Sequence, residues 1–260
     1  MKIRKILTFY LIFLCFFNVS IVYADDEDDE LDYSFVYEET VEDVKESISE
    51  PKILSRSAVI YDRDSKQVIW GKQENLRVPM ASTTKIMTAI ILLEHGDLNQ
   101  VITVDRTAAG IGGSRLGLHI NDSITLNDLL YGLLICSGND AAVQIAISIA
   151  GSVAEFSEIM NQKASELGLL DTHFVTPHGL DKEEHYTTAY ELAVITDYAM
   201  QIEKFREVVG SMTHTVTISG NPRIIRNTNE LLGHINGVNG VKTGFTNKAR
   251  KMSDKLCNKK

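Results

Sequence analysis

Short β-rich segments lie near both ends of the body of this chain, and the long stretch between them has helical periodicity. Residues 57–61 and 67–70 are rich in β-branched and aromatic side chains and are joined by five polar residues, which predicts a hairpin. Residues 241–245 form a last β-rich segment. Strands at both ends with helices between them predict an α+β domain whose sheet is closed by its two termini.

The stretch between these strands is predicted to be mainly helical. Apolar residues recur at helical spacing over residues 86–93, and Pro79, a residue favoured at helix starts, precedes them. The same spacing covers residues 125–150, where Ser137-Gly138 interrupts the apolar run. The other expected elements are helices at 153–167 and 187–200, a loop at 110–117, and paired strands at 213–218 and 223–225.

The first 51 residues are predicted to lie outside this body. Residues 1–24 combine a basic start, a short apolar run and small residues at a cleavage position, which predicts a signal peptide and an exported chain; an uncleaved anchor is the alternative. Residues 25–51 are expected to be an acidic linker, because residues 25–50 hold 13 acidic residues and one lysine. The remaining body is neutral and has no basic stripe, so nucleic acid is not an expected partner.

Ser82-Thr83-Thr84-Lys85 opens the first predicted helix. Residues i and i+3 are neighbours on a helix surface, so the Ser82 hydroxyl and the Lys85 amine are expected on one face. A serine hydroxyl needs a base to become a nucleophile, and a lysine can be that base when burial or a nearby cation lowers its pKa. A second Ser-x-x-Lys, at residues 49–52, contains Pro51 and is discarded.

Two further short motifs follow in order. Ser137-x-Asn139 lies between two predicted helices, and Lys242-Thr243-Gly244 lies in the last predicted strand. Ser-x-Asn alone has little specificity, because residues 219–221 repeat it in a predicted turn. The ordered set of three motifs is a much stronger signal of nucleophilic acyl transfer.

With the sequence around these motifs, the chain resembles the serine-type D-Ala-D-Ala carboxypeptidases, the low-molecular-mass penicillin-binding proteins of peptidase family S11. The segments that carry the resemblance are residues 78–82, 137–141, 177–181, 186–189 and 240–245. It implies a β-lactamase/transpeptidase-like α+β fold, with a helical cluster packed on an antiparallel sheet. It also implies removal of the terminal D-Ala from peptidoglycan pentapeptides ending in D-Ala-D-Ala, binding of β-lactam antibiotics, no metal or other cofactor, and a location at the cell wall or outer membrane face.

The resemblance assigns a role to each motif residue. Ser82 is expected to attack the carbonyl between the two D-Ala residues while Lys85 takes its proton, and Lys242 is expected to lower the pKa of Lys85. Ser137 would relay a proton to the departing D-Ala. The substrate-binding residues would be Asn139, Lys242, Thr243, Gly244 and Phe245, with the backbone N–H groups of Ser82 and Phe245 forming the oxyanion site.

The tail departs from the family pattern. Residues 250–260 are polar and basic and have no period-2 pattern, where the family continues with β-rich sequence. The catalytic domain at 52–249 is therefore expected to be incomplete, truncated or frameshifted after Ala249, with its C-terminal strands and membrane anchor missing and residues 241–245 without a ladder partner. A non-catalytic remnant with weak or no activity is the second hypothesis.

Three other hypotheses have less support. A class A β-lactamase would need Ser-Asp-Asn and Glu-x-x-Leu-Asn, and the sequence has neither. A nucleophilic role for Cys136 is disfavoured, since this residue is expected to be a packed thiol. A disulfide between Cys136 and Cys257 stays an alternative. A metal site is disfavoured because the histidines and carboxylates of one segment have no metal-ligand spacing; they are His173, His178, His185, Asp171, Asp181 and Glu183.

Overall fold

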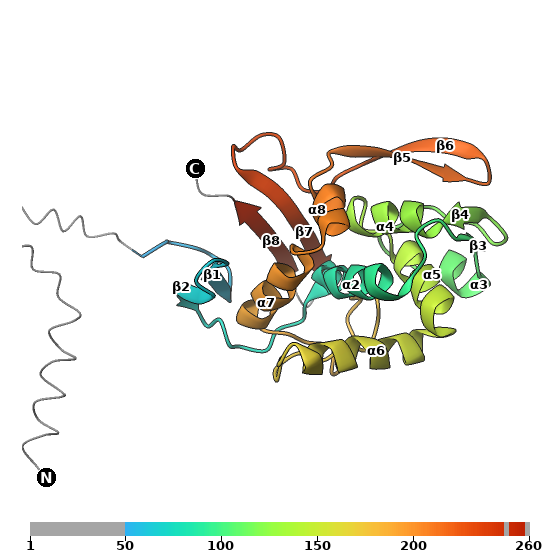
Figure 1. Cartoon of the computed structure of the whole chain (residues 1–260). Coiled ribbons are helices and arrows are strands. Elements are labelled where there is room, and N and C mark those ends of the chain that lie inside the picture. The colour runs from blue at the N-terminus through green and yellow to red at the C-terminus, as the bar shows by residue number, and fades with distance from the viewer. Residues whose placement is uncertain (1–49, 247–249, 258–260) are drawn as a thin grey trace, which may run out of the picture. The chain divides into compact units, whose positions relative to one another are not determined.

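The computed structural model describes residues 50–246 and 250–257 (Figure 1). The chain divides into Met1–Lys52 and Ile53–Lys260, and the elements below belong to the second unit. The predicted signal peptide and nearly all of the acidic linker lie outside the described residues. The helices are η1 (Ala81–Thr84, a 3-10 turn), α2 (Lys85–His95), α3 (Arg106–Gly110), α4 (Leu126–Leu134), α5 (Asn139–Ala150), α6 (Val153–Glu166), α7 (Ala189–Ala199) and α8 (Glu203–Val209). The strands are β1 (Ala58–Asp62), β2 (Gln67–Lys72), β3 (Val101–Thr103), β4 (Ser123–Thr125), β5 (Thr213–Ile218), β6 (Asn221–Arg226), β7 (Val238–Thr246) and β8 (Arg250–Cys257).

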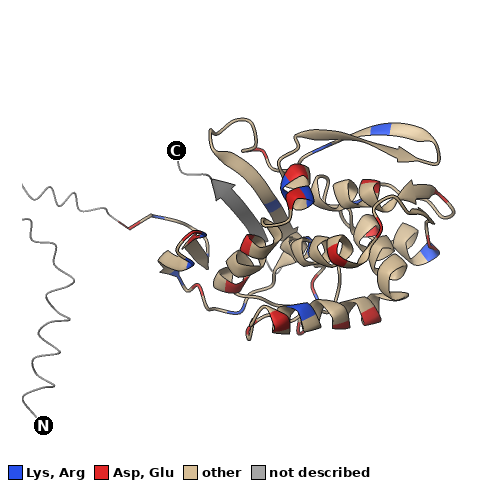
Figure 2. Ribbon diagram, viewed as in Figure 1, with Lys and Arg blue, Asp and Glu red and all other residues tan. Residues whose placement is uncertain are grey.

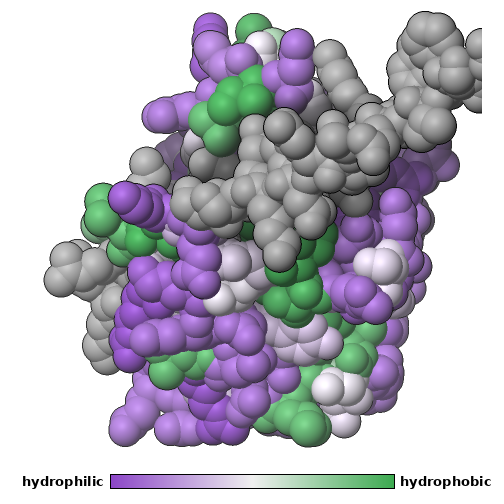
Figure 3. All heavy atoms as spheres, turned by 90° about the vertical axis from the view of Figure 1, so that its left-hand side faces the viewer, coloured by the Kyte–Doolittle hydropathy of each residue, from purple (hydrophilic) through white to green (hydrophobic). Residues whose placement is uncertain are grey.

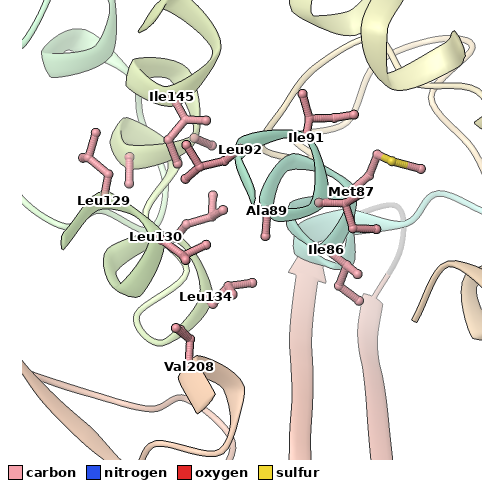
Figure 4. Close-up of a cluster of buried hydrophobic side chains, with 14 of the residues drawn as sticks. Ile86, Met87, Ala89, Ile91, Leu92, Leu129, Leu130, Leu134, Ile145 and Val208 are labelled. Atoms are coloured by element: carbon pink, nitrogen blue, oxygen red, sulfur yellow. The ribbon is translucent and has the colours of Figure 1, made fainter. Parts of the chain in front are cut away.

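Helix α2 lies at the centre of the core. Its residues from Lys85 to Leu92 are all buried, so the helix is enclosed on every side rather than amphipathic. Figure 4 shows Leu92 of α2 pointing toward Ile145 of α5 and Leu130 of α4, while Ile91 and Met87 point to the other sides of the helix. Burial of a Leu or Ile side chain contributes about 1.5–3 kcal/mol each. The start of α2 is therefore fixed by the packing of the whole helical cluster.

The long helices predicted from periodicity are confirmed, and their ends have recognisable caps. Thr125 accepts a hydrogen bond from the Asp128 N–H at the start of α4, and Thr188 does the same for Glu191 in α7. Gly151 ends α5 with φ 83°, a left-handed conformation that glycine adopts without strain.

Several short elements were not predicted. The strands β3 and β4 and the helices α3 and α8 have three to seven residues each, too few to show a period in sequence. Pro79 lies two residues before η1 rather than just inside the helix, because a 3-10 turn precedes α2.

The strands form four separate antiparallel pairs among the described residues. The hairpins β1–β2 and β5–β6 are confirmed. The expectation that one sheet is closed by the two ends of the chain is wrong, since β1–β2 and β7–β8 do not share a ladder. The β1–β2 turn is instead anchored to α7 by ion pairs. The Asp197 carboxylate lies 2.8 Å from Arg63 Nε and 2.6 Å from Lys66 Nζ.

The prediction that residues 241–245 have no ladder partner is wrong. Strand β8 pairs antiparallel with β7, from Thr246↔Arg250 to Val238↔Cys257, with one irregularity between Val238 and Gly240. At least one C-terminal strand is thus present. The tail lacks an apolar alternation, but ladder bonds are made by backbone groups that every residue except proline carries in full.

The surface outside the core is mixed in character. Figure 2 shows acidic and basic residues interspersed over α6 and α8, and Figure 3 shows apolar patches separated by polar areas on one face. Exposed apolar side chains include Ile60, Val68 and Ile69 of the β1–β2 hairpin. Within the described residues no single helix is long and apolar enough to cross a membrane; only α5 and α6 taken together pass that test, across an 85° bend.

Candidate active site

Ser82 lies on η1, immediately before α2. The preceding residue, Ala81, has φ 46°, a left-handed conformation that costs a non-glycine residue about 1–2 kcal/mol. Two hydroxyls stabilise this turn: Thr83 donates to the Met80 carbonyl, and Thr84 donates to the Ala81 carbonyl at 2.8 Å. Ser82 itself is partly exposed, while its neighbours in the turn are buried. The turn therefore presents one hydroxyl at the surface of a rigid core.

Lys85 is fully buried and lies next to Ser82. Its Nζ is 3.0 Å from Ser82 Oγ, 2.7 Å from Asn139 Oδ1 and 2.7 Å from the His178 carbonyl oxygen. Burial, followed by the nearby charge of Lys242, holds the pKa of Lys85 well below its usual value of 10.5. An amine that has lost its proton can accept the Ser82 hydroxyl proton along the same 3.0 Å contact. The spacing predicted from sequence is thus realised in space.

Ser137 and Asn139 lie where α4 gives way to α5. Asn139 is held at both ends of its amide, since Oδ1 accepts from Lys85 and Nδ2 donates to the Gly112 carbonyl at 2.8 Å. Ser137 is buried and has φ 62°, another left-handed residue. In the part of the chain that the structure describes, its hydroxyl makes no hydrogen bond with Ser82 or Lys85. Ser137 is thus linked to these residues only through the chain, two positions before Asn139.

Asp140, the residue after Asn139, holds the loop facing α5. Its buried carboxylate accepts the backbone N–H groups of Leu116 at 2.7 Å, Gly117 at 2.7 Å and Leu118 at 3.0 Å. Such charge-assisted bonds to backbone donors are strong. They fix the position of the loop that runs from Gly112, the acceptor for Asn139, to residue 118.

Strand β7 brings the third motif to the nucleophile. A Cβ added to Gly244 would lie 3.0 Å from the Ser82 nitrogen, so only glycine lets the two backbones approach this closely. Lys242 is buried, its Nζ donates to the Thr243 carbonyl at 2.8 Å, and burial lowers its pKa to about 8. The Thr243 hydroxyl lies 2.9 Å from that of Thr228. The Phe245 side chain is 69% exposed, so only its backbone fits the predicted role.

The loop from residue 172 to residue 187 completes the site and was only partly anticipated. The His178 carbonyl accepts a hydrogen bond from Lys85 Nζ, and the Pro177 carbonyl accepts one from the Thr88 hydroxyl at 2.6 Å. Burial lowers the pKa of His178 to about 3 and that of His185 to about 4, so both imidazoles are neutral near pH 7. The sequence pointed to this segment through the resemblance at residues 177–181 and 186–189, but it did not show the contact with Lys85, because a backbone carbonyl leaves no residue-type signal.

Other predicted features of this region have simple outcomes. Among the described residues no group of three or more His, Cys, Asp or Glu side chains could hold a metal ion. Cys136 is a free, half-buried thiol that donates to the Gly132 carbonyl, and burial raises its pKa. The side chains that the described residues bring together here are the Ser82 hydroxyl and two buried lysines, Lys85 and Lys242, whose pKa values are both lowered.

The sequence is similar to those of known proteins. Residues 44–253 match the D-alanyl-D-alanine carboxypeptidase family, peptidase family S11. The D-alanyl-D-alanine carboxypeptidase DacF of Bacillus subtilis is 37% identical over 202 residues, which cover 75% of this chain and 52% of that protein; the chain thus spans about half its length. DacB2 of Mycobacterium tuberculosis is 35% identical over 207 residues, 79% of this chain and 71% of that protein.

Solved structures agree with these sequence matches. The DD-transpeptidase of Streptomyces K15 superposes with a TM-score of 0.74 at 30% identity, over 78% of this chain and 85% of that one. A D-alanyl-D-alanine carboxypeptidase from Mycobacterium tuberculosis H37Rv gives a TM-score of 0.74 at 34% identity, over 77% of this chain and 76% of that one. The α+β, transpeptidase-like fold is thereby confirmed, and the chain belongs to the D-alanyl-D-alanine carboxypeptidase family, peptidase family S11.

Proposed function

We propose that this chain is a serine-type D-Ala-D-Ala carboxypeptidase that acts on peptidoglycan stem peptides and is acylated by β-lactams. The observation that carries the proposal is the contact of 3.0 Å between Ser82 Oγ and the Nζ of Lys85, a buried lysine with a depressed pKa. A nucleophile and a base in hydrogen-bond contact are the minimum requirement for acyl transfer through a serine.

The proposed reaction has two stages, acylation of Ser82 and hydrolysis of the acyl-enzyme. Ser82 Oγ attacks the carbonyl carbon between the two D-Ala residues as its proton passes to Lys85 Nζ. The carbon–nitrogen bond to the last D-Ala then breaks, and its amine leaves with a proton delivered through Ser137. Water hydrolyses the ester on Ser82, which releases the shortened peptide and restores the free hydroxyl. A β-lactam enters the same first step, but its ring opens without losing a leaving group.

Strand β7 supplies the substrate's binding groups in this proposal. Lys242 provides a positive charge and Thr243 a hydroxyl for the terminal carboxylate, while Asn139 holds the substrate amide. The glycine at position 244 lets the strand lie close to the Ser82 backbone, and the substrate backbone would lie along this strand as an added edge. The backbone N–H groups of Ser82 and Phe245 form the oxyanion site, a type of interaction worth about 3–4 kcal/mol per donor in a transition state.

Two observations favour an active enzyme over a non-catalytic remnant. Strand β8 gives β7 a ladder partner, whereas the remnant hypothesis rested on its absence. The second observation is that Lys85 is held by hydrogen bonds to both Asn139 and His178. The sequence keeps all three motifs, at Ser82, Ser137 and Lys242.

The test is release of free D-alanine from a peptide ending in D-Ala-D-Ala, measured on the full chain. We expect release by the wild type and none by Ser82→Ala, a substitution that leaves the fold intact because it removes a single oxygen atom. Release that survives Ser82→Ala, or a well-folded wild type that releases nothing, would contradict the proposal.

We also propose that the chain works outside the cytoplasm, at the cell wall or the outer face of the membrane. The support is the signal-peptide pattern of residues 1–24 and the location of the proposed substrate. N-terminal sequencing of the protein recovered from the extracytoplasmic fraction tests this. A chain that stays in the cytoplasm with Met1 intact would contradict it.

A further inference from the structure

A chain of hydrogen bonds runs from the 172–187 loop to the residue before the nucleophile. The backbone N–H of Val175 donates to His185 Nδ1 at 2.9 Å. His185 Nε2 lies 2.9 Å from the Thr84 hydroxyl, which lies 2.8 Å from the Ala81 carbonyl oxygen. Since Nδ1 is an acceptor, Nε2 carries the proton and donates to Thr84, which in turn donates to Ala81.

The imidazole of His185 is fixed in one charge state and one tautomer. The side chain is 4% exposed, and burial lowers its pKa to about 4. Its ring and that of Phe174 form a T-shaped pair, with ring centroids 6.0 Å apart. A neutral imidazole with one acceptor and one donor nitrogen gives the hydrogen-bond chain a single direction.

The Ala81 carbonyl at the end of this chain needs to be held. Ala81 is a buried, left-handed residue directly before Ser82, and such a conformation persists only where surrounding groups impose it. Gly179 of the same loop lies against this carbonyl, since a Cβ there would be only 1.8 Å from Ala81 O. The loop thus constrains the turn at the same time as His178 constrains Lys85.

We propose that His185 is a positioning residue for the nucleophile, acting through Thr84 on the strained turn at Ala81. His185 touches neither substrate nor reacting atoms. Without it the turn relaxes, and Ser82 Oγ moves away from Lys85 Nζ. The inference rests on the proposed acylation of Ser82, and it adds that the chemical step depends on this hydrogen-bond chain while initial ligand binding does not.

The test separates binding from chemistry with a fluorescent penicillin in rapid-mixing experiments. We expect Thr84→Val to lower the acylation rate constant about tenfold, the effect of one buried hydrogen bond on a barrier, with an unchanged dissociation constant for the first complex. Thr84→Ser keeps the hydroxyl and should restore the rate. His185→Phe should behave like Thr84→Val, and His185→Gln, which keeps a donor near Thr84, should recover part of the rate.

The control for loss of a buried hydroxyl is Ser157→Ala. Ser157 is a buried α6 residue whose hydroxyl donates to the Val153 carbonyl at 2.9 Å within its own helix. Its loss should leave the acylation rate constant unchanged. Equal slowing by Ser157→Ala and Thr84→Val would overturn the proposal, because both would then act through a general loss of stability.

Wild-type rates in Thr84→Val and His185→Phe would overturn it as well. A folded wild type that is not acylated at all would contradict the proposed function, and this inference with it, so the two failures are distinguishable.

Discussion

The start of α2 and the strand β7 both bring residues to the site, but they are held in different ways. Lys85 begins a helix packed against α4, α5 and α8, and Ser82 lies on the 3-10 turn directly before it. The 172–187 loop holds both, through His178 and Gly179. Lys242 and Gly244 belong to a strand whose only ladder partner among the described residues is β8. The nucleophile and its base are therefore built into the core. The proposed carboxylate site depends on the β7–β8 ladder, the close approach of Gly244 to Ser82, and two side-chain hydrogen bonds, one between Thr228 and Thr243 and one from Asn229 to the Gly240 carbonyl.

This difference separates two kinds of sensitivity. Changes at Lys85 or its partners act on chemistry inside a rigid core, where packing allows little adjustment. Changes at β7 act on the alignment of substrate, and a two-stranded ladder can yield without the core unfolding. Substitutions in the two regions should differ in size and in which step they affect.

The largest effect is expected from Lys85→Ala. Loss of a general base costs about 10²–10⁴-fold in rate, so covalent labelling by penicillin should fall about a thousandfold. Labelling is measured as the adduct fraction over time by mass spectrometry. The control is Lys163→Ala, which removes a lysine of α6 whose Nζ lies 2.8 Å from the Glu94 carboxylate. This substitution should leave labelling unchanged. Comparable losses in both variants would mean that Lys85 acts only through stability.

A chain ending at Ala249 should lose about a hundredfold in acylation rate, the scale of a misplacement of about 1 Å in an active site. Without β8 the strand β7 has no described ladder, while the contacts of α2 remain. Amide hydrogen exchange should accordingly quicken along β7 and stay slow in α2. A truncated chain with the rate and exchange of the full one would show that β8 does not hold β7.

Two glycine substitutions compare the same regions by steric strain. Gly179→Ala should destabilise the fold by about 2–3 kcal/mol, because its Cβ would lie 1.8 Å from Ala81 O at φ 84°. Gly244→Ala should cost about 1 kcal/mol, since contacts of 3.0–3.4 Å require small shifts of a yielding strand.

Denaturant unfolding measures both substitutions. Gly112→Ala, with nothing within 4 Å, is the control and should change little. A cost for Gly244→Ala above that for Gly179→Ala would reverse the proposed order of rigidity.

A further effect concerns pH. Lys242 has a pKa of about 8, so its positive charge, and the affinity for a substrate carboxylate, should fall as pH rises through 8. KM for a D-Ala-D-Ala peptide should increase about tenfold between pH 7 and 9, the ratio of the protonated fractions of Lys242. The kcat should not fall, because a higher pH favours the unprotonated form of the base Lys85.

The lowered pKa of Lys242 also affects the free energy of unfolding, which should increase with pH. An unfolded lysine holds its proton up to about 10.5, so the unfolded state binds more protons between pH 8 and 10.5. The contribution of Lys242 to stability therefore rises with pH across that window. A KM independent of pH up to 10 would contradict the role of its charge.

The sequence predicted some parts of the molecule better than others, for physical reasons. Long helices such as α5 and the spacing of Ser82 and Lys85 are local properties, so periodicity and the i, i+3 rule were sufficient. The pairing of β8 with β7 was missed because backbone ladders leave no mark on a polar sequence. The roles of Thr84 and His185 were missed because they depend on contacts between residues 101 positions apart.

The most direct test of this account is to map the covalent adduct on the intact chain. After brief exposure to benzylpenicillin, mass spectrometry should find a single adduct with the mass of the whole antibiotic, on the peptide that contains Ser82. The adduct should be absent from Ser82→Ala and nearly absent from Lys85→Ala. An adduct on Ser137 or on Cys136, or no adduct at all, would contradict the account.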